Sequence, residues 1–161
     1  MVRAAELAPK PDHLDLVQAA AVPLAALTAW QGLFDHGAMR AGQRVLIHGG
    51  AGGVGHFAIQ FAKAKGAHVA TTASEQDLEF VRSLGADVAI DYRNQRFEDE
   101  VQNIDLVFDL IAGETQERSW AVLREGGTLV STLPSRRRNR PAPGAWQGVG
   151  DDQAALARAG T

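Results

Sequence analysis

The sequence predicts an α/β fold in which a doubly wound, parallel sheet of about five strands carries helices on both faces. Three observations lead to this prediction. Apolar runs suited to buried strands alternate with segments of helical periodicity, the connections are short, and glycines mark the helix ends. Consecutive strand–helix–strand units are right-handed, so they join into one sheet with the expected strand order 3-2-1-4-5.

The elements are expected in the following order. Residues 13–36 form a helical lead-in, expected as two pieces that meet at Pro23 because proline breaks a helix interior. No sixth strand is found, although a complete fold of this type usually has six. Strands are predicted at residues 45–48, 68–73, 87–92, 104–111 and 126–133. Helices are predicted at residues 54–66, 75–84, 97–102 and 114–123.

The character of the chain changes after Leu133. Residues 1–133 read as one domain, whereas residues 134–161 are rich in arginine, proline, glycine and alanine. This composition predicts a disordered tail, and such an abrupt change is also what reading a GC-rich gene out of frame gives. A basic patch for phosphates is the alternative, which the lack of interleaved aromatics disfavours. Without a sixth strand, the fifth would be an unpaired edge open to a non-native edge-strand dimer.

Composition excludes several classes of protein. The chain has 161 residues, a net charge of −3 and no cysteine, so it holds no disulfide and no thiolate metal site. No secretory signal is visible, and no apolar run approaches the ~20 residues that span a bilayer. Residues 1–133 carry 11 basic and 17 acidic residues, which argues against a nucleic-acid surface. We therefore expect a cytoplasmic protein without membrane or nucleic-acid partners.

A glycine-rich turn lies between the first strand and the next helix. Gly50, Gly52 and Gly55 form the pattern GxGxxG in a strand–turn–helix context, which is typical of Rossmann-type dinucleotide sites. Gly50 permits the tight turn, Gly52 lets the backbone approach a pyrophosphate, and Gly55 lets the helix pack on the strand. Free N–H groups at the helix start attract phosphate. The candidate cofactor-binding residues here are Gly50, Ala51, Gly52, Gly53, Val54 and Gly55.

The end of the second strand bears on the choice of cofactor. NAD sites usually carry a carboxylate there, whereas this strand ends in Ala73 and Ser74. The absence of a carboxylate favours NADP(H) over NAD(H). No lysine or arginine is found near this strand end, and Asp77 follows instead.

Several blocks resemble the zinc-independent quinone oxidoreductase branch of the medium-chain dehydrogenase/reductase superfamily. The resemblance is collinear from Leu14 to Leu133. The blocks that carry it are AAAVPLAALTAWQGLFDHG, AGQRVLIHGGAGGVGHFAIQFAKAKGA, LGADVAIDYR, VFDLIAGET and LREGGTLVS.

The resemblance implies further cofactor contacts. Ser74 would meet the adenosine ribose or its phosphate, and Tyr92 the 2′-phosphate of NADP(H). Leu110 and Ile111 would pack on the ribose–nicotinamide side. Two more contacts are implied near the nicotinamide, Thr28 and Ser131. An alternative for Thr28 is a hydrogen bond to its own helix backbone.

The resemblance also implies a function. Members of this branch transfer hydride from NADPH or NADH to quinones, enones or related carbonyl compounds. The family's β-rich substrate domain precedes the point where this chain begins, so we expect the chain alone to be inactive and to hold no catalytic residue. Its scattered histidines show no zinc spacing, and we expect no metal. Two alternatives stay open: a non-catalytic dinucleotide-binding module, and the enoyl-reductase unit of a larger synthase.

Overall fold

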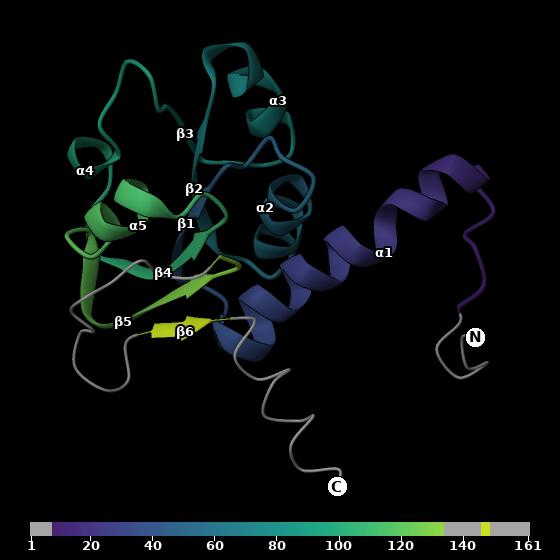
Figure 1. Cartoon of the computed structure of the whole chain (residues 1–161), viewed down its shortest axis with the longest axis horizontal. Coiled ribbons are helices and arrows are strands. Elements are labelled where there is room, and N and C mark those ends of the chain that lie inside the picture. The colour runs from purple at the N-terminus through teal and green to yellow at the C-terminus, as the bar shows by residue number, and fades with distance from the viewer. Residues whose placement is uncertain (1–7, 134–145, 149–161) are drawn as a thin grey trace, which may run out of the picture.

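The sheet is parallel and has the strand order of a doubly wound fold. The structure, a computed structural model, describes residues 8–133 and 146–148. Within these residues the sheet has the order β3-β2-β1-β4-β5-β6, so the expected order 3-2-1-4-5 is confirmed (Figure 1). The strands are β1 (Arg44–His48), β2 (His68–Ala73), β3 (Val88–Asp91), β4 (Ile104–Asp109), β5 (Leu123–Ser131) and β6 (Trp146–Gly148).

The sixth strand corrects the sequence prediction. Residues 146–148 pair in parallel with residues 129–131, so the expectation of a sheet that ends at β5 with an unpaired edge is wrong. A strand of three residues between proline and glycine carries too short a pattern to be recognised in a sequence. Residues 134–145 and 149–161 lie outside the described residues, and with them most of the segment interpreted as disordered or out of frame.

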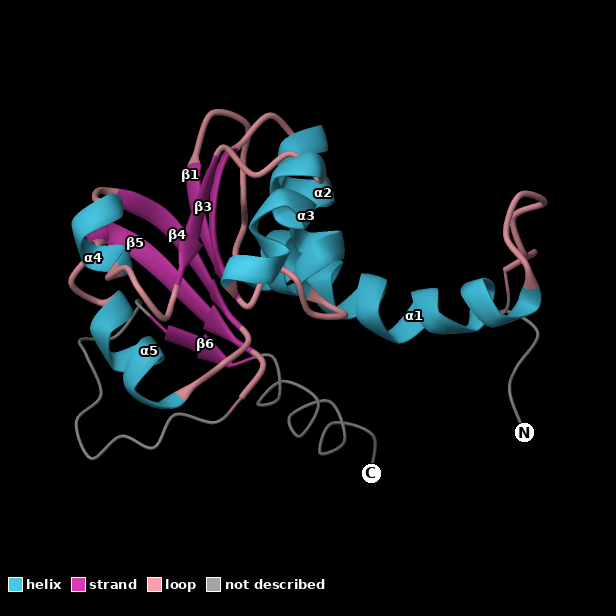
Figure 2. Cartoon of the chain, turned by 90° about the horizontal axis from the view of Figure 1, so that it is seen from above, coloured by secondary structure: helices cyan, strands magenta, loops and turns pink. Residues whose placement is uncertain are grey.

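Helices cover both faces of the sheet. Figure 1 and Figure 2 show α2 and α3 on one face and α4 and α5 on the other. Side chains alternate along β1, so that Val45 and Ile47 join the core under α2, while Leu46 joins the core beside α4. The helices are α1 (Leu16–Trp30), η2 (Gln31–His36), α2 (Gly55–Ala64), η3 (Glu75–Asp77), α3 (Leu78–Ser83), α4 (Phe97–Glu100) and α5 (Gly113–Ser119).

The helix α1 runs through Pro23 without the expected break. It begins at a capping box in which the Gln18 N–H donates to Asp15 Oδ1 at 2.7 Å. Pro23 is exposed, so water can replace the backbone hydrogen bond that the proline removes. The helical geometry changes instead at η2, a π-helix in which a Cβ on Gly32 would lie 2.4 Å from Phe108.

The outer part of α1 extends away from the sheet (Figure 1). Leu16, Val17 and Leu24 are 77–83% exposed. The continuous helical segment Leu16–His36 has 21 residues, and an 18-residue window of it has a mean hydropathy of 1.3, enough to cross a membrane by length and composition. The expectation that no apolar run approaches that length is therefore wrong, because Thr28, Gln18 and Gln31 interrupt the sequence without making the segment polar. Core helices of soluble proteins and signal sequences have the same property.

Candidate cofactor-binding site

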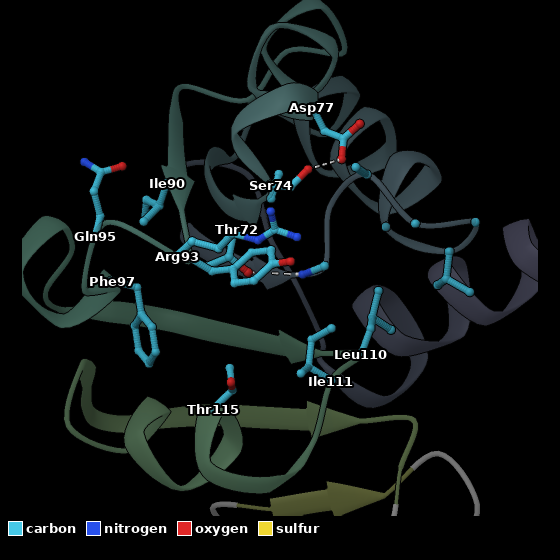
Figure 3. A pocket seen from close by; sticks show the side chains of 18 of the residues that line it. Thr72, Ser74, Asp77, Ile90, Arg93, Gln95, Phe97, Leu110, Ile111 and Thr115 are labelled. Atoms are coloured by element: carbon cyan, nitrogen blue, oxygen red, sulfur yellow. Dashed lines mark hydrogen bonds between the residues drawn. The ribbon is translucent and has the colours of Figure 1, made fainter.

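A cavity of about 770 Å³ opens at the carboxyl ends of the strands, beside the turn between β1 and α2. In doubly wound sheets ligands bind at this edge, where the strand order reverses. In Figure 3, Thr72 and Ser74 come from the end of β2, Leu110 and Ile111 from the loop after β4, and Thr115 from α5. The cavity therefore draws its walls from elements that are distant in sequence.

The glycine turn presents unpaired donors to this cavity. The N–H groups of Gly50 and Gly52 are used by carbonyls inside the fold. In the described part of the chain, those of Gly53, Val54 and Gly55 donate to no protein acceptor. They stand at the start of α2, where the helix dipole adds partial positive charge. Such an arrangement suits a phosphate or pyrophosphate.

The glycines of the turn have different physical roles. A Cβ on Gly50 would lie 2.0 Å from Thr71 Oγ1, so this residue lets the turn approach β2. A Cβ on Gly55 would lie 2.2 Å from the Gly49 carbonyl oxygen, which fixes the packing of α2 on the turn. Around Gly53, by contrast, nothing lies within 4 Å of an added Cβ. The space beside Gly53 is thus left open to a ligand.

The cavity wall near the end of β2 carries both an acidic and a basic side chain. Ser74 Oγ donates to Asp77 Oδ2 at 2.5 Å, and both residues line the cavity with Ala73 (Figure 3). Arg93 lines the same cavity, and its guanidinium lies 5.6 Å from the centre of the Tyr92 ring. The expectation of no basic residue near this strand end is wrong in three dimensions, since Arg93 follows the neighbouring strand β3.

A buried carboxylate supports the wall formed by the loop after β4. Asp109 Oδ1 accepts the backbone N–H groups of Ile111 and Ala112, both at 3.0 Å. Its Oδ2 accepts hydrogen bonds from Gln116 Nε2 and Ser131 Oγ, both at 2.9 Å. Ser131 is therefore buried against Asp109 and does not line the cavity, contrary to its expected position at the rim.

The structure brings together most of the residues that the sequence singled out. Thr28 is an exception, because its hydroxyl donates to the Leu24 carbonyl at 2.7 Å, which was the alternative considered for it. Ser131 is a second exception, as described above. Gly50 is the third, since it is buried beneath the turn. Their roles as cofactor contacts stay predictions. The residues that do line the cavity are Ala51, Gly52, Gly53, Val54, Gly55, Ala73, Ser74, Tyr92, Leu110 and Ile111.

Comparison with known proteins identifies the family. Residues 53–132 match the family described as zinc-binding dehydrogenase. The NADPH-dependent alkenal/one oxidoreductase of Arabidopsis thaliana is 47% identical over 127 residues, which are 78% of this chain and 32% of that protein. An alcohol dehydrogenase superfamily protein from Novosphingobium aromaticivorans superposes with a TM-score of 0.82 at 40% identity, over 95% of this chain and 49% of that one. The chain belongs to the medium-chain dehydrogenase/reductase superfamily.

The match to this superfamily covers the dinucleotide-binding part of its members. The chain spans 31% to 40% of the length of three curated relatives that it matches, from Solanum lycopersicum, Arabidopsis thaliana and Danio rerio. The nucleotide-binding subdomain of the enoylreductase domain of PpsC from Mycobacterium tuberculosis is similar in extent, with 85% of each chain covered, a TM-score of 0.71 and 29% identity. The described residues thus correspond to one part of these longer relatives.

Sequence reasoning missed part of the lining. Arg118 and Phe97 come from helices of the opposite face, and no sequence pattern indicates that they meet. Arg118 donates to both carboxylate oxygens of Glu98 at 2.5 and 2.6 Å and lies 5.0 Å from the centre of the Phe97 ring. The hydrogen bond lowers the pKa of the Glu98 carboxyl and raises the pKa of the Arg118 guanidinium. The lining residues not predicted are Gly49, Thr72, Asp77, Ile90, Arg93, Gln95, Phe97, Thr115, Arg118 and Thr132.

Metal ligands are the remaining question for a chain that matches a family described as zinc-binding. Within residues 8–133 and 146–148, no three His, Asp or Glu side chains form a cluster that could hold a metal ion. The absence of zinc from the reaction stays an expectation from the resemblance.

Proposed function

We propose that the chain binds NADP(H) and forms the cofactor-binding part of a zinc-independent oxidoreductase that reduces quinones, enones or related carbonyl compounds. One observation carries the proposal: three adjacent N–H groups, those of Gly53, Val54 and Gly55, are unpaired at the start of a helix and face a cavity. Backbone donors and a helix dipole together bind the charge of a pyrophosphate. When bound, the dinucleotide supplies the hydride of the reaction.

The residues of this chain would bind and orient the cofactor. The N–H groups of the turn hold the pyrophosphate, while Leu110 and Ile111 offer an apolar wall for the nicotinamide half. Ile111 is 54% exposed, so a planar ring can cover it. Asp109 holds the backbone of this wall in place through the two N–H groups that it accepts. Positioning of two reactants in this way accounts for much of the rate of hydride transfer.

We propose that NADP(H) binds at least as tightly as NAD(H). Arg93 and Tyr92 lie on the cavity wall that the adenosine would contact, and a guanidinium forms strong, charge-assisted hydrogen bonds with a phosphate. Asp77 lies on the same cavity and repels such a group. Because this repulsion opposes the attraction of Arg93, and because the Ser74 hydroxyl already donates to Asp77, we expect the preference for NADP(H) to be modest.

The test is a substitution in the open part of the turn. A Cβ on Gly52 would lie 3.3 Å from the Gly49 oxygen, a tight contact at which the turn must shift by a few tenths of an ångström. Because this shift is small, we expect Gly52→Val to leave the domain folded but to fill the pyrophosphate site, weakening NADPH binding more than about tenfold, or about 1.4 kcal/mol. Ala64→Val, on an exposed position of α2 outside the cavity, is the matched control. Calorimetric titration with NADPH measures both, and equal affinity in the two variants would overturn the assignment.

An enoyl-reductase unit of a larger synthase is the second candidate. It is favoured by the similarity in extent to the PpsC subdomain. Acyl-carrier or ketosynthase sequence next to this chain in its gene would support it, whereas a β-rich domain encoded directly upstream would support a separate reductase. For either one, we expect the 161-residue chain alone to bind cofactor without reducing quinones.

A further inference from the structure

His48 is the last residue of β1 and directly precedes the glycine turn. Its side chain is 0% exposed, and both ring nitrogens have partners. Nδ1 lies 3.2 Å from Thr72 Oγ1, and Nε2 lies 2.9 Å from Ser119 Oγ. The Phe97 ring meets the imidazole edge to face, with 4.7 Å between ring centres. Both polar atoms of this buried ring are therefore satisfied within the fold.

The neighbouring hydrogen bonds fix the direction of this contact. The Ser119 hydroxyl donates its proton to the Thr115 carbonyl at 2.6 Å, so it can only accept from His48. Nε2 must therefore carry the proton, and Nδ1 is left as an acceptor for the Thr72 hydroxyl. Thr72 Oγ1 in turn accepts the Gly49 N–H at 3.2 Å. Along this series, from the Gly49 N–H to the Thr115 carbonyl of α5, each group donates a hydrogen bond to the next.

The two ends of this series lie on opposite walls of the cavity. Gly49 and Thr72 line it beside the glycine turn, and Thr115 lines it from α5. We propose that His48, as a neutral imidazole protonated at Nε2, is a positioning residue that orients the Thr72 hydroxyl, and through it the glycine turn, and thereby sets the affinity for the pyrophosphate. The inference rests on the proposed function, because it assigns His48 a part in binding the dinucleotide.

The surroundings of His48 favour the neutral ring. Burial lowers its pKa to about 4, which outweighs the attraction of the Asp109 carboxylate on β4. Arg118 on α5 lowers the pKa further, and Glu98 on α4 raises it. A cationic ring would also lack the Nδ1 lone pair that accepts the Thr72 hydroxyl. The geometry of the hydrogen bonds and the charge state therefore agree.

Two substitutions separate positioning from space filling. Asn at position 48 places an amide oxygen near Nδ1 and can keep the contact with Thr72, whereas Gln reaches toward Nε2 and can keep only the contact with Ser119. Gln is closer to His in volume. If His48 acts through the glycine turn, His48→Asn should bind NADPH within about twofold of wild type, and His48→Gln about tenfold more weakly, or about 1.4 kcal/mol. Space filling predicts the reverse order.

A second ligand tests where the loss arises. Adenosine 2′-monophosphate has no pyrophosphate and does not reach the glycine turn, so both variants should bind it as wild type does. Equal losses for NADPH and for this nucleotide, or better NADPH binding by His48→Gln, would overturn the inference while leaving the proposed function intact. If wild type itself does not bind NADPH, the proposed function fails and the inference fails with it.

A measurement on the wild-type chain needs no variant to fold. Long-range ¹H–¹⁵N spectra at pH 6 should show His48 neutral and protonated at Nε2, and its resonances should shift when NADPH is added. They should not shift with adenosine 2′-monophosphate. A ring protonated at Nδ1, or one that does not respond to NADPH, would refute the proposed role.

Discussion

Lowering the pH should destabilise the fold through His48. Its pKa is about 4 in the folded chain and 6.5 in an ordinary environment, so the folded state binds fewer protons between these values. The stabilising effect of the neutral ring is fully present above pH 6.5 and is lost as the pH falls toward 4. At about 1.4 kcal/mol per pH unit, the full shift corresponds to about 3 kcal/mol of unfolding free energy. About 2 kcal/mol of this should be lost by pH 5.

Urea unfolding of wild type and His48→Asn between pH 7 and pH 4.5 measures this effect. The asparagine does not titrate, so the difference in unfolding free energy between the two proteins isolates His48. The carboxyls of Asp87, Glu98 and Asp105 have lowered pKa values and also destabilise the fold in acid, but at lower pH and in both proteins. A difference that stays constant from pH 7 to pH 4.5 would refute the assignment of a buried, neutral histidine.

Two further predictions concern the cofactor preference and the turn. Arg93→Ala should weaken NADPH binding about tenfold with little effect on NADH, and Asp77→Asn should strengthen NADPH binding severalfold. Titration with both dinucleotides gives the ratio of the NADPH and NADH affinities. A ratio unchanged from wild type in both variants would contradict the proposed adenosine wall. Gly55→Ala should lower the unfolding free energy by more than about 2 kcal/mol, because its Cβ would lie 2.2 Å from the Gly49 oxygen, whereas Gly53→Ala should change it by less than about 1 kcal/mol. Urea unfolding compares the pair, and similar losses would show that the turn relaxes around either side chain.

The sheet and the turn could be predicted because their signals are local. Val45, Leu46 and Ile47 form an apolar run, and the spacing of Gly50, Gly52 and Gly55 records where backbone must approach backbone. The same local patterns place strand ends, and therefore the candidate residues on them, at one edge of the sheet.

The rest depends on contacts between distant segments. Arg93 reaches the cavity because β3 lies next to β2, and Ser131 turns away from the cavity because Asp109 offers it a buried acceptor. Pro23 fails to break α1 because that part of the helix is exposed. None of these outcomes is contained in the sequence around the residue concerned.

The polar residues beneath the cavity explain how its least apolar wall is held. The helix α5 has the sequence GETQERS, which offers no apolar side chain for burial. Two of its residues are nevertheless buried, Ser119 against His48 and Gln116 against Asp109. Leaving such a buried partner unsatisfied costs about 1–3 kcal/mol, so both contacts strongly favour one position of the helix. The strand-end residues that lie in register across this layer are Thr72, His48, Asp109 and Ser131. Because the same layer also bonds the backbone of the glycine turn and of the loop after β4, a ligand that spans the cavity meets walls whose separation is fixed before it binds.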